Sequence, residues 1–155
     1  MKKYLFVLSS AILITLSLYP FNLSFLAFLF FIPAFYGILK AENLKEKIFL
    51  SLFFGISIFA LNFFWAIKTI EFYGKLPAFL SYILGLPLSI WQTLPFIIFL
   101  LAFPYLLKKN IILPAIFFPL LTNLLPLIFP YSISSTLSST PLLCKSVEIW
   151  GGMGA

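Results

Sequence analysis

The residues that could do chemistry in this chain are few and of few kinds. The ten basic residues are all lysines, the four acidic residues are all glutamates, and there is a single cysteine. Histidine, aspartate and arginine are absent from the sequence. A Ser-His-Asp triad, a Cys-His pair, a histidine-ligated metal and an arginine fork for phosphate are therefore excluded. We expect no metal site, no cofactor and no catalytic residue in this chain.

Cys144 is the one side chain that could serve as a nucleophile. An ordinary thiol, with a pKa of about 8.5, needs a base or a nearby cation to react well. The only charged neighbours in the sequence are Lys145 and Glu148. We interpret Cys144 as a small apolar residue near a membrane surface.

Glu71 stands between Lys68 and Lys75 at spacings of three and four residues, which places the three on one face of a helix. One interpretation is an exposed, screened turn, because surface ion pairs contribute little. The other is a site that meets phospholipid headgroups, with Trp65 and Tyr73 in the aromatic belt of a membrane. The second interpretation predicts lipid contact by all five side chains.

Composition determines where these residues must lie. The chain has 155 residues, of which 63% are hydrophobic and 9% charged, with a mean hydropathy of +1.14. These values are typical of a membrane protein. Since a membrane helix needs about 20 mostly apolar residues, we predict an all-α, polytopic transmembrane bundle over residues 1–131. The expected segments lie near 4–18, 23–39, 48–67, 77–103 and 111–129.

Three features of these segments qualify the prediction. The first could be a cleaved signal peptide, but no A-x-A-like site follows it, so we expect it to be retained. The fourth is too long for a straight span and contains Gly85, Pro87 and Pro95, so it must tilt, kink or break. Residues 132–155 are expected to form a Ser/Thr-rich outer loop and an interfacial segment.

The lysines predict the orientation of the chain. Seven would lie on one side of the membrane and three on the other if the N-terminus is cytoplasmic, as the positive-inside rule requires. The larger group is Lys2, Lys3, Lys40, Lys45, Lys47, Lys108 and Lys109, and the smaller is Lys68, Lys75 and Lys145. Because the lysines lie at the ends of apolar runs, we expect no nucleic-acid partner.

The third segment carries small or polar residues at spacings of four, seven and four, which predicts one packing face. These residues are Ser51, Gly55, Asn62 and Ala66. We expect a helix-packing seam in which Asn62 bonds across the contact. The alternative is a polar substrate-binding site.

The order of several motifs carries a family resemblance. The stretches are "LSLYPFNLSFLAFLFFIPAFYGI", "FFGISIFALNFFWAIKTIEFYGKLP" and "PLIFPYSISSTLSSTPLLCKSVEIWGGMGA". Together they resemble the N-terminal membrane region of bacterial apolipoprotein N-acyltransferase. Phe129, Pro130, Tyr131, Gly151 and Gly154 match a Phe-Pro-(Trp/Tyr) corner and a Gly-x-x-Gly approach of that family.

The resemblance implies a function in lipoprotein maturation at the bacterial inner membrane. The family moves an acyl chain from phospholipid to the N-terminal cysteine of diacylated lipoproteins, using Glu, Lys and Cys of an outer-face nitrilase-like domain. Since this sequence ends before such a domain, we interpret it as an incomplete reading frame, a split gene or a truncated copy, and we expect the chain alone to be inactive. It could serve as a partner to a separately encoded remainder. The alternative is a small polytopic protein of transport or membrane-assembly type, with a cleft at the fourth segment.

Overall fold

The computed structural model describes residues 2–18 and 21–125, and every regular element within them is helical. This confirms the all-α class predicted from the sequence. The elements are α1 (Lys2–Ser17), a 3-10 turn η1 (Ser24–Phe28), α2 (Phe31–Leu39), α3 (Leu44–Ile58), a π-helical turn η2 (Phe59–Phe63), α4 (Phe64–Gly74), α5 (Ala78–Lys109) and α6 (Leu113–Leu124).

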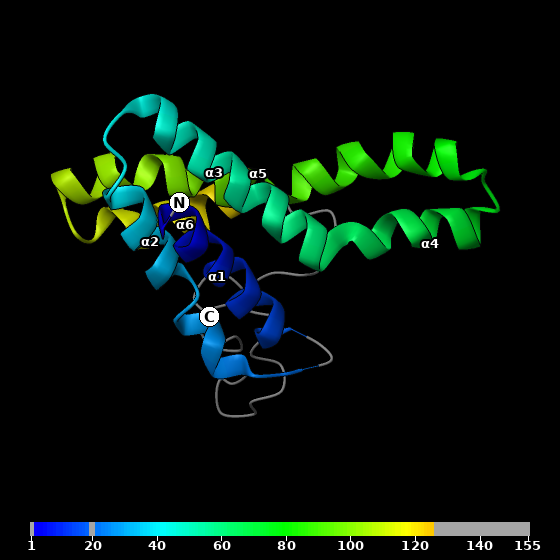
Figure 1. Ribbon diagram of the computed structural model, residues 1–155, viewed down its shortest axis with the longest axis horizontal. Coiled ribbons are helices and arrows are strands. Elements are labelled where there is room, and N and C mark those ends of the chain that lie inside the picture. Colours follow the sequence, from blue (N-terminus) through cyan, green and yellow to red (C-terminus); the bar gives the residue numbers. More distant parts are fainter. Residues whose placement is uncertain (1, 19–20, 126–155) are drawn as a thin grey trace.

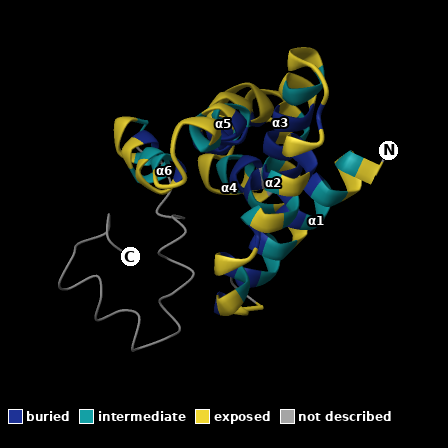
Figure 2. Cartoon of the chain, turned by 90° about the vertical axis from the view of Figure 1, so that its left-hand side faces the viewer, coloured by how far each residue is buried: buried dark blue, intermediate teal, exposed yellow. Residues whose placement is uncertain are grey.

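Helix α5 runs back along the rod formed by α3, η2 and α4 (Figure 1). The α3 half of this rod also packs against α1, and α1 packs against α2. The other half, α4 with the facing turns of α5, projects from these helices as a hairpin (Figure 1). Buried positions gather where α1, α2, α3 and α5 meet, whereas α6 is mostly exposed or half-buried (Figure 2).

The described residues contain one helix, α5, that is by itself long and apolar enough to cross a membrane. The pair Leu44–Phe63 and Trp65–Gly74 meets the same criterion only when its two parts, bent by 44°, are counted together. The helical stretches Ser24–Leu39 and Leu113–Leu124 are apolar but shorter. The structure thus supports one clear span, or two with the bent rod, of the five that we predicted.

Proline residues mark several helix starts. Pro33 lies in the first turn of α2, where its missing N–H costs least, so the predicted segment 23–39 is divided into η1 and α2. Pro114 occupies the first turn of α6 in the same way. Pro77 directly precedes α5, which continues without a break through its three internal prolines.

The rod bends at η2, where the helical ladder widens to π-type hydrogen bonding. Asn62 lies in this turn, and its Nδ2 donates to the carbonyl oxygen of Ile58, four residues earlier, at 3.1 Å. We expected Asn62 to bond across a helix contact. Its amide instead donates to a carbonyl group of its own helix. A π-type turn is one of the identifiable causes of a helix bend.

Two glycines allow α5 to approach the rod closely. A Cβ at Gly55 of α3 would collide with the side chain of Ile97 on α5. A Cβ at Gly85 of α5 would lie 2.8 Å from Cγ1 of Ile67 on α4 and 3.2 Å from its Cα. Small residues at helix contacts permit such backbone proximity. The position of α5 therefore depends on the absence of a side chain at Gly55 and Gly85.

We expect Gly85→Ala to lower the free energy of unfolding by about 1–3 kcal/mol, the usual cost of overpacking. The backbone of Ile67 cannot move aside as the tip of a side chain can. The matched control is Gly74→Ala, where the nearest atom is Cγ of Leu76 at 3.4 Å, an ordinary contact. Unfolding in mixed micelles with increasing SDS measures both variants, and equal stabilities would contradict the prediction.

The charged start of α3 ties it to α1. Asn43 caps the helix by accepting a hydrogen bond from the Glu46 N–H at 2.8 Å. Lys3 Nζ donates to both Glu46 carboxylate oxygens, at 2.9 and 3.0 Å, and the Glu42 N–H donates to Oε2 at 2.9 Å. The bond from Lys3, and next that from Glu42, lower the pKa of Glu46. Glu46 lies just before the apolar stretch 48–67, and so outside the expected membrane segment.

The lowered pKa of Glu46 predicts a loss of stability in acid only. Its stabilising effect is complete above the ordinary carboxyl pKa of about 4.3 and is lost as the pH falls through the lower, folded-state pKa. Glu46→Gln should therefore flatten the acid limb of stability against pH. Unfolding midpoints from pH 7 to pH 3 measure this, with exposed Glu42→Gln as the control. An unchanged acid limb in Glu46→Gln would refute the assignment.

Candidate functional site

The lipid-contact residues predicted from the sequence all lie on the hairpin of α4 and the first turns of α5 (residues 64–90), hereafter the α4–α5 hairpin. Ile67 and Ser81 are fully buried between its two helices. Its outer surface is apolar and aromatic: Phe72, Tyr73 and Phe79 are each more than 70% exposed. The hairpin thus has a packed interior and an outer surface with few apolar partners within the described chain.

Lys68 and Glu71 form an ion pair on the surface of α4. Lys68 Nζ donates to Glu71 Oε2 at 2.9 Å, and this hydrogen bond, more than the accompanying attraction of charges, raises the pKa of Lys68. The spacings of three and four residues allowed Glu71 to pair with Lys68 or Lys75, and the pair forms with Lys68. Trp65 and Tyr73 lie exposed on the same helix. The negative charge of Glu71 is thus balanced by that of Lys68.

The tip of the hairpin carries Lys75 in a left-handed conformation. Its φ is 50° and its ψ 32°, at the C-cap of α4, although Gly74 precedes it directly. A left-handed residue with a side chain costs roughly 1–2 kcal/mol, and glycine normally occupies this position. Within the described residues Lys75 makes no ion pair. The tip therefore keeps an exposed cation where a glycine would fit with less strain.

The four predicted seam residues lie on both sides of η2. Ser51 and Gly55 of α3 are buried, with Gly55 against Ile97 of α5, and Ala66 of α4 is also buried. Asn62 is half-buried in η2. No group of three or more His, Cys, Asp or Glu side chains that could hold a metal ion occurs among the described residues.

Comparison with known families decides what this helical region belongs to. A family model for the apolipoprotein N-acyltransferase N-terminal domain matches residues 10–155. The chain belongs to this family. Neither the curated proteins nor the solved structures gave a significant match. Apolipoprotein N-acyltransferases are membrane enzymes that act on phospholipid and lipoprotein substrates, so membership implies a role in lipoprotein maturation.

The residues that carried part of the resemblance lie outside the described structure. These are Phe129, Pro130, Tyr131, Gly151 and Gly154, and Cys144 also lies there. The described part of this acyltransferase region has no histidine, arginine or cysteine.

Sequence reasoning missed two contacts that position the hairpin. The seam prediction covered α3 and α4 but not their partner, in which Gly85 and Ile97 of α5 supply the facing surface. A signal was available, since Ser81, Gly85 and Ser89 are spaced by four residues and all three are buried. Such a run of small residues predicts a helix-packing face.

The strain at Lys75 predicts that Lys75→Asn stabilises the protein by up to about 1 kcal/mol in neutral micelles, because asparagine tolerates the left-handed conformation. Lys75→Gly should behave similarly. Adding phosphatidylglycerol to the micelles should narrow the difference in unfolding free energy between the wild type and these variants, since only the lysine gains an electrostatic contact with the lipid. Unfolding curves with and without the lipid test this. A difference insensitive to phosphatidylglycerol would show that the tip lysine makes no headgroup contact.

Proposed function

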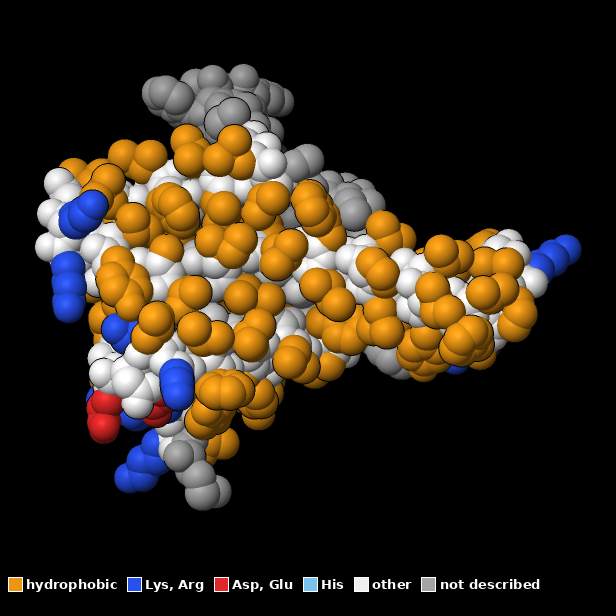
Figure 3. Space-filling view, turned by 90° about the horizontal axis from the view of Figure 1, so that it is seen from above, with side chains coloured by type: hydrophobic (Ala, Val, Ile, Leu, Met, Phe, Trp, Pro, Cys, Tyr) orange, Lys and Arg blue, Asp and Glu red, His pale blue; other side chains and the backbone are white. Residues whose placement is uncertain are grey.

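We propose that this chain forms the membrane-embedded region of an apolipoprotein N-acyltransferase and presents the tip of the α4–α5 hairpin to phospholipid headgroups at the outer face. The observation that carries the proposal is the distribution of charge along α5 and its neighbours. Cations gather at the two ends of the molecule, and the surface between them is apolar (Figure 3).

The length of α5 fits a bilayer. Its 32 residues, at 1.5 Å each, extend about 48 Å. A bilayer with its headgroup layers is roughly 40–45 Å thick, so a moderately tilted α5 reaches both surfaces. Lys108 and Lys109 close one end, and Lys75 lies just before the other. No lysine or glutamate lies between Ala78 and Leu107.

The same two ends collect the other charges. Lys47 Nζ lies 5.0 Å from the centre of the Tyr105 ring, which brings the start of α3 to the end of α5. Lys3 pairs with Glu46 at that end. Seven described lysines belong to this end of the fold and two, Lys68 and Lys75, to the hairpin. The positive-inside rule then favours a cytoplasmic N-terminus and an outer-face hairpin.

The exposed apolar surface supports the same placement. Phe25, Phe28 and Ile32 on η1 and α2, and Ile83 and Ile90 on α5, are all exposed hydrophobic residues. Contiguous apolar surface of this kind is rare on monomers in water. We propose that α1, η1–α2 and α6 lie in the bilayer with the bent rod and α5, as a multi-pass bundle. Trp65 and Tyr73 would then lie at headgroup depth.

In this proposal the chain holds lipid and does not itself transfer the acyl group. Lys68, Glu71 and Lys75 face the headgroups of a phospholipid, and the diacylated lipoprotein approaches along the same outer surface. Acyl transfer is supplied by the catalytic domain of the family. No observation favours the transport alternative, because α5 continues unbroken and carries no charge in its interior.

Topology can be tested by cysteine labelling in intact cells. In a Cys144→Ser background, Lys75→Cys should react with a membrane-impermeant maleimide, whereas Lys109→Cys should react only after the membrane is opened. The opposite pattern would overturn the proposed orientation. Recovery of the chain in the soluble fraction would overturn the membrane placement.

The role in lipoprotein maturation needs its own assay. In cells depleted of their own acyltransferase, co-expression with a catalytic domain of the family should restore N-acylation of lipoproteins, scored by mass spectrometry of their N-termini. Co-expression of that domain with the Gly85→Ala variant should restore less, in proportion to its loss of folded protein. Equal acylation with and without this chain would refute the role.

A further inference from the structure

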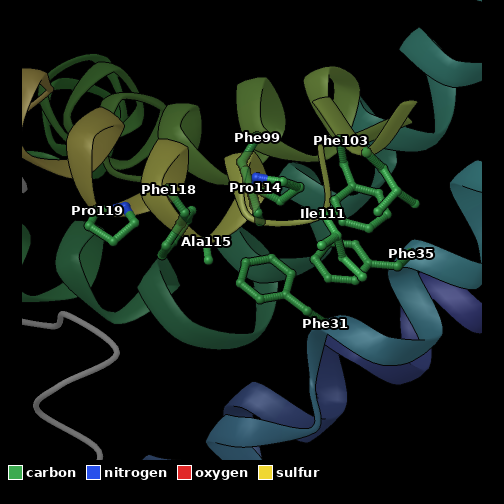
Figure 4. Close-up of a pocket in the computed structure, with 10 residues that line it drawn as sticks. Phe31, Phe35, Phe99, Phe103, Ile111, Pro114, Ala115, Phe118 and Pro119 are labelled. Carbon is green, nitrogen blue, oxygen red and sulfur yellow. The ribbon is translucent and has the colours of Figure 1, made fainter. Parts of the chain in front are cut away.

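An apolar cavity of about 430 Å³ opens between α2, α5 and α6, far from the α4–α5 hairpin. Figure 4 shows phenylalanine rings around it, including Phe35 of α2, Phe103 of α5 and Phe118 of α6. Every lining side chain is hydrocarbon. A volume of this size lies within the usual range of small-molecule sites. None of the residues proposed to contact headgroups at the outer face lines it.

The cavity reaches the lysine-rich end of the molecule. Phe31 contacts Phe99 at 5.1 Å between ring centres, and Phe35 stacks on Phe103 at 3.6 Å, so α2 and α5 run in the same direction. Five residues beyond Phe35 and Phe103 lie Lys40, the C-cap of α2, and Lys108, in the last turn of α5 with Lys109. Leu107 and Ile111 both line the cavity, and Lys108, Lys109 and Asn110 are the stretch of chain between them, hereafter the rim.

One side of the cavity is open. Ala115 and Ile111 line it and are exposed, Ile111 by 78%. Water gains little in a site without polar partners. A flexible hydrocarbon chain fits both the volume and the chemistry.

The charge at the rim selects the headgroup. Lys40, Lys108 and Lys109 form no ion pair among the described residues, and the nearby carboxylates of Glu42 and Glu46 lie beside Lys3. Lys40 Nζ lies 4.2 Å from the centre of the Tyr36 ring. Lys108 and Lys109 thus place unpaired cations in the chain directly after the lining residue Leu107, which matches an amphiphile with an anionic head.

We propose that this cavity holds one acyl chain of an anionic phospholipid whose phosphate lies against Lys108 and Lys109. The inference rests on the proposed membrane placement, which sets this end in the cytoplasmic leaflet. The lipid is thus separated by the thickness of the bilayer from the headgroups at the hairpin. It is a bound lipid that fills the space between α2, α5 and α6, and it is not the acyl donor.

Native mass spectrometry of the detergent-purified chain, titrated with phosphatidylglycerol or phosphatidylcholine, tests the proposal. The wild type should bind one phosphatidylglycerol more tightly than phosphatidylcholine. Ala115→Trp, which fills the mouth of the cavity, should lose that binding, whereas Ala78→Trp, exposed on the hairpin, should keep it. Because both changes add the same side chain, their difference reports the cavity.

A second variant tests the rim without touching the core. Replacing Lys108 and Lys109 by glutamine should weaken phosphatidylglycerol binding by about 30-fold and leave phosphatidylcholine binding unchanged. Equal binding of the two lipids, or equal binding by both tryptophan variants, would overturn the proposal. The titration is made in detergent, so loss of lipid binding in it does not depend on whether the chain enters membranes. Membrane insertion is measured separately by cell fractionation.

Discussion

The close approach of α5 to the α3–α4 rod is the contact on which the rest of this structure depends. Helix α5 also packs against α2 and α6, so its position sets theirs, and α1 is held in turn by α2 and α3. The approach needs Gly55 in the rod and Gly85 on α5, each facing an isoleucine of the other element. Polar contacts between helices are few in the described chain, so shape complementarity of small and large side chains selects this arrangement.

The sequence predicted the helical class and placed Glu71 within helical reach of Lys68 and Lys75, because both depend on local pattern. Periodicity could not predict the 44° bend at η2, since a π-type turn adds one residue without any change in apolar composition. It could not assign the left-handed residue either: glycine is the usual choice, and the chain places Lys75 there, one residue after Gly74.

The cavity escaped the sequence analysis for a different reason. Its walls join helices that are distant in the chain, and a gap between packed helices depends on how three elements meet. Some of its signal was nevertheless present, because Phe31 and Phe35 repeat the four-residue spacing of Phe99 and Phe103. Two such pairs predict matching aromatic ridges. The place of the cavity beside these ridges depends on α6, which forms one of its walls and starts four residues after α5 ends.

The π-turn has a consequence for how this region can change during evolution. Each α-helical residue rotates the chain by about 100°, so the loss of the additional residue in η2 would turn the whole of α4 about its axis. Trp65 and Lys68 would then face a different direction while the α3 half of the rod kept its contacts. A single-codon deletion could thus re-aim the outer aromatic surface, whereas an ordinary substitution at Asn62 would alter only one hydrogen bond.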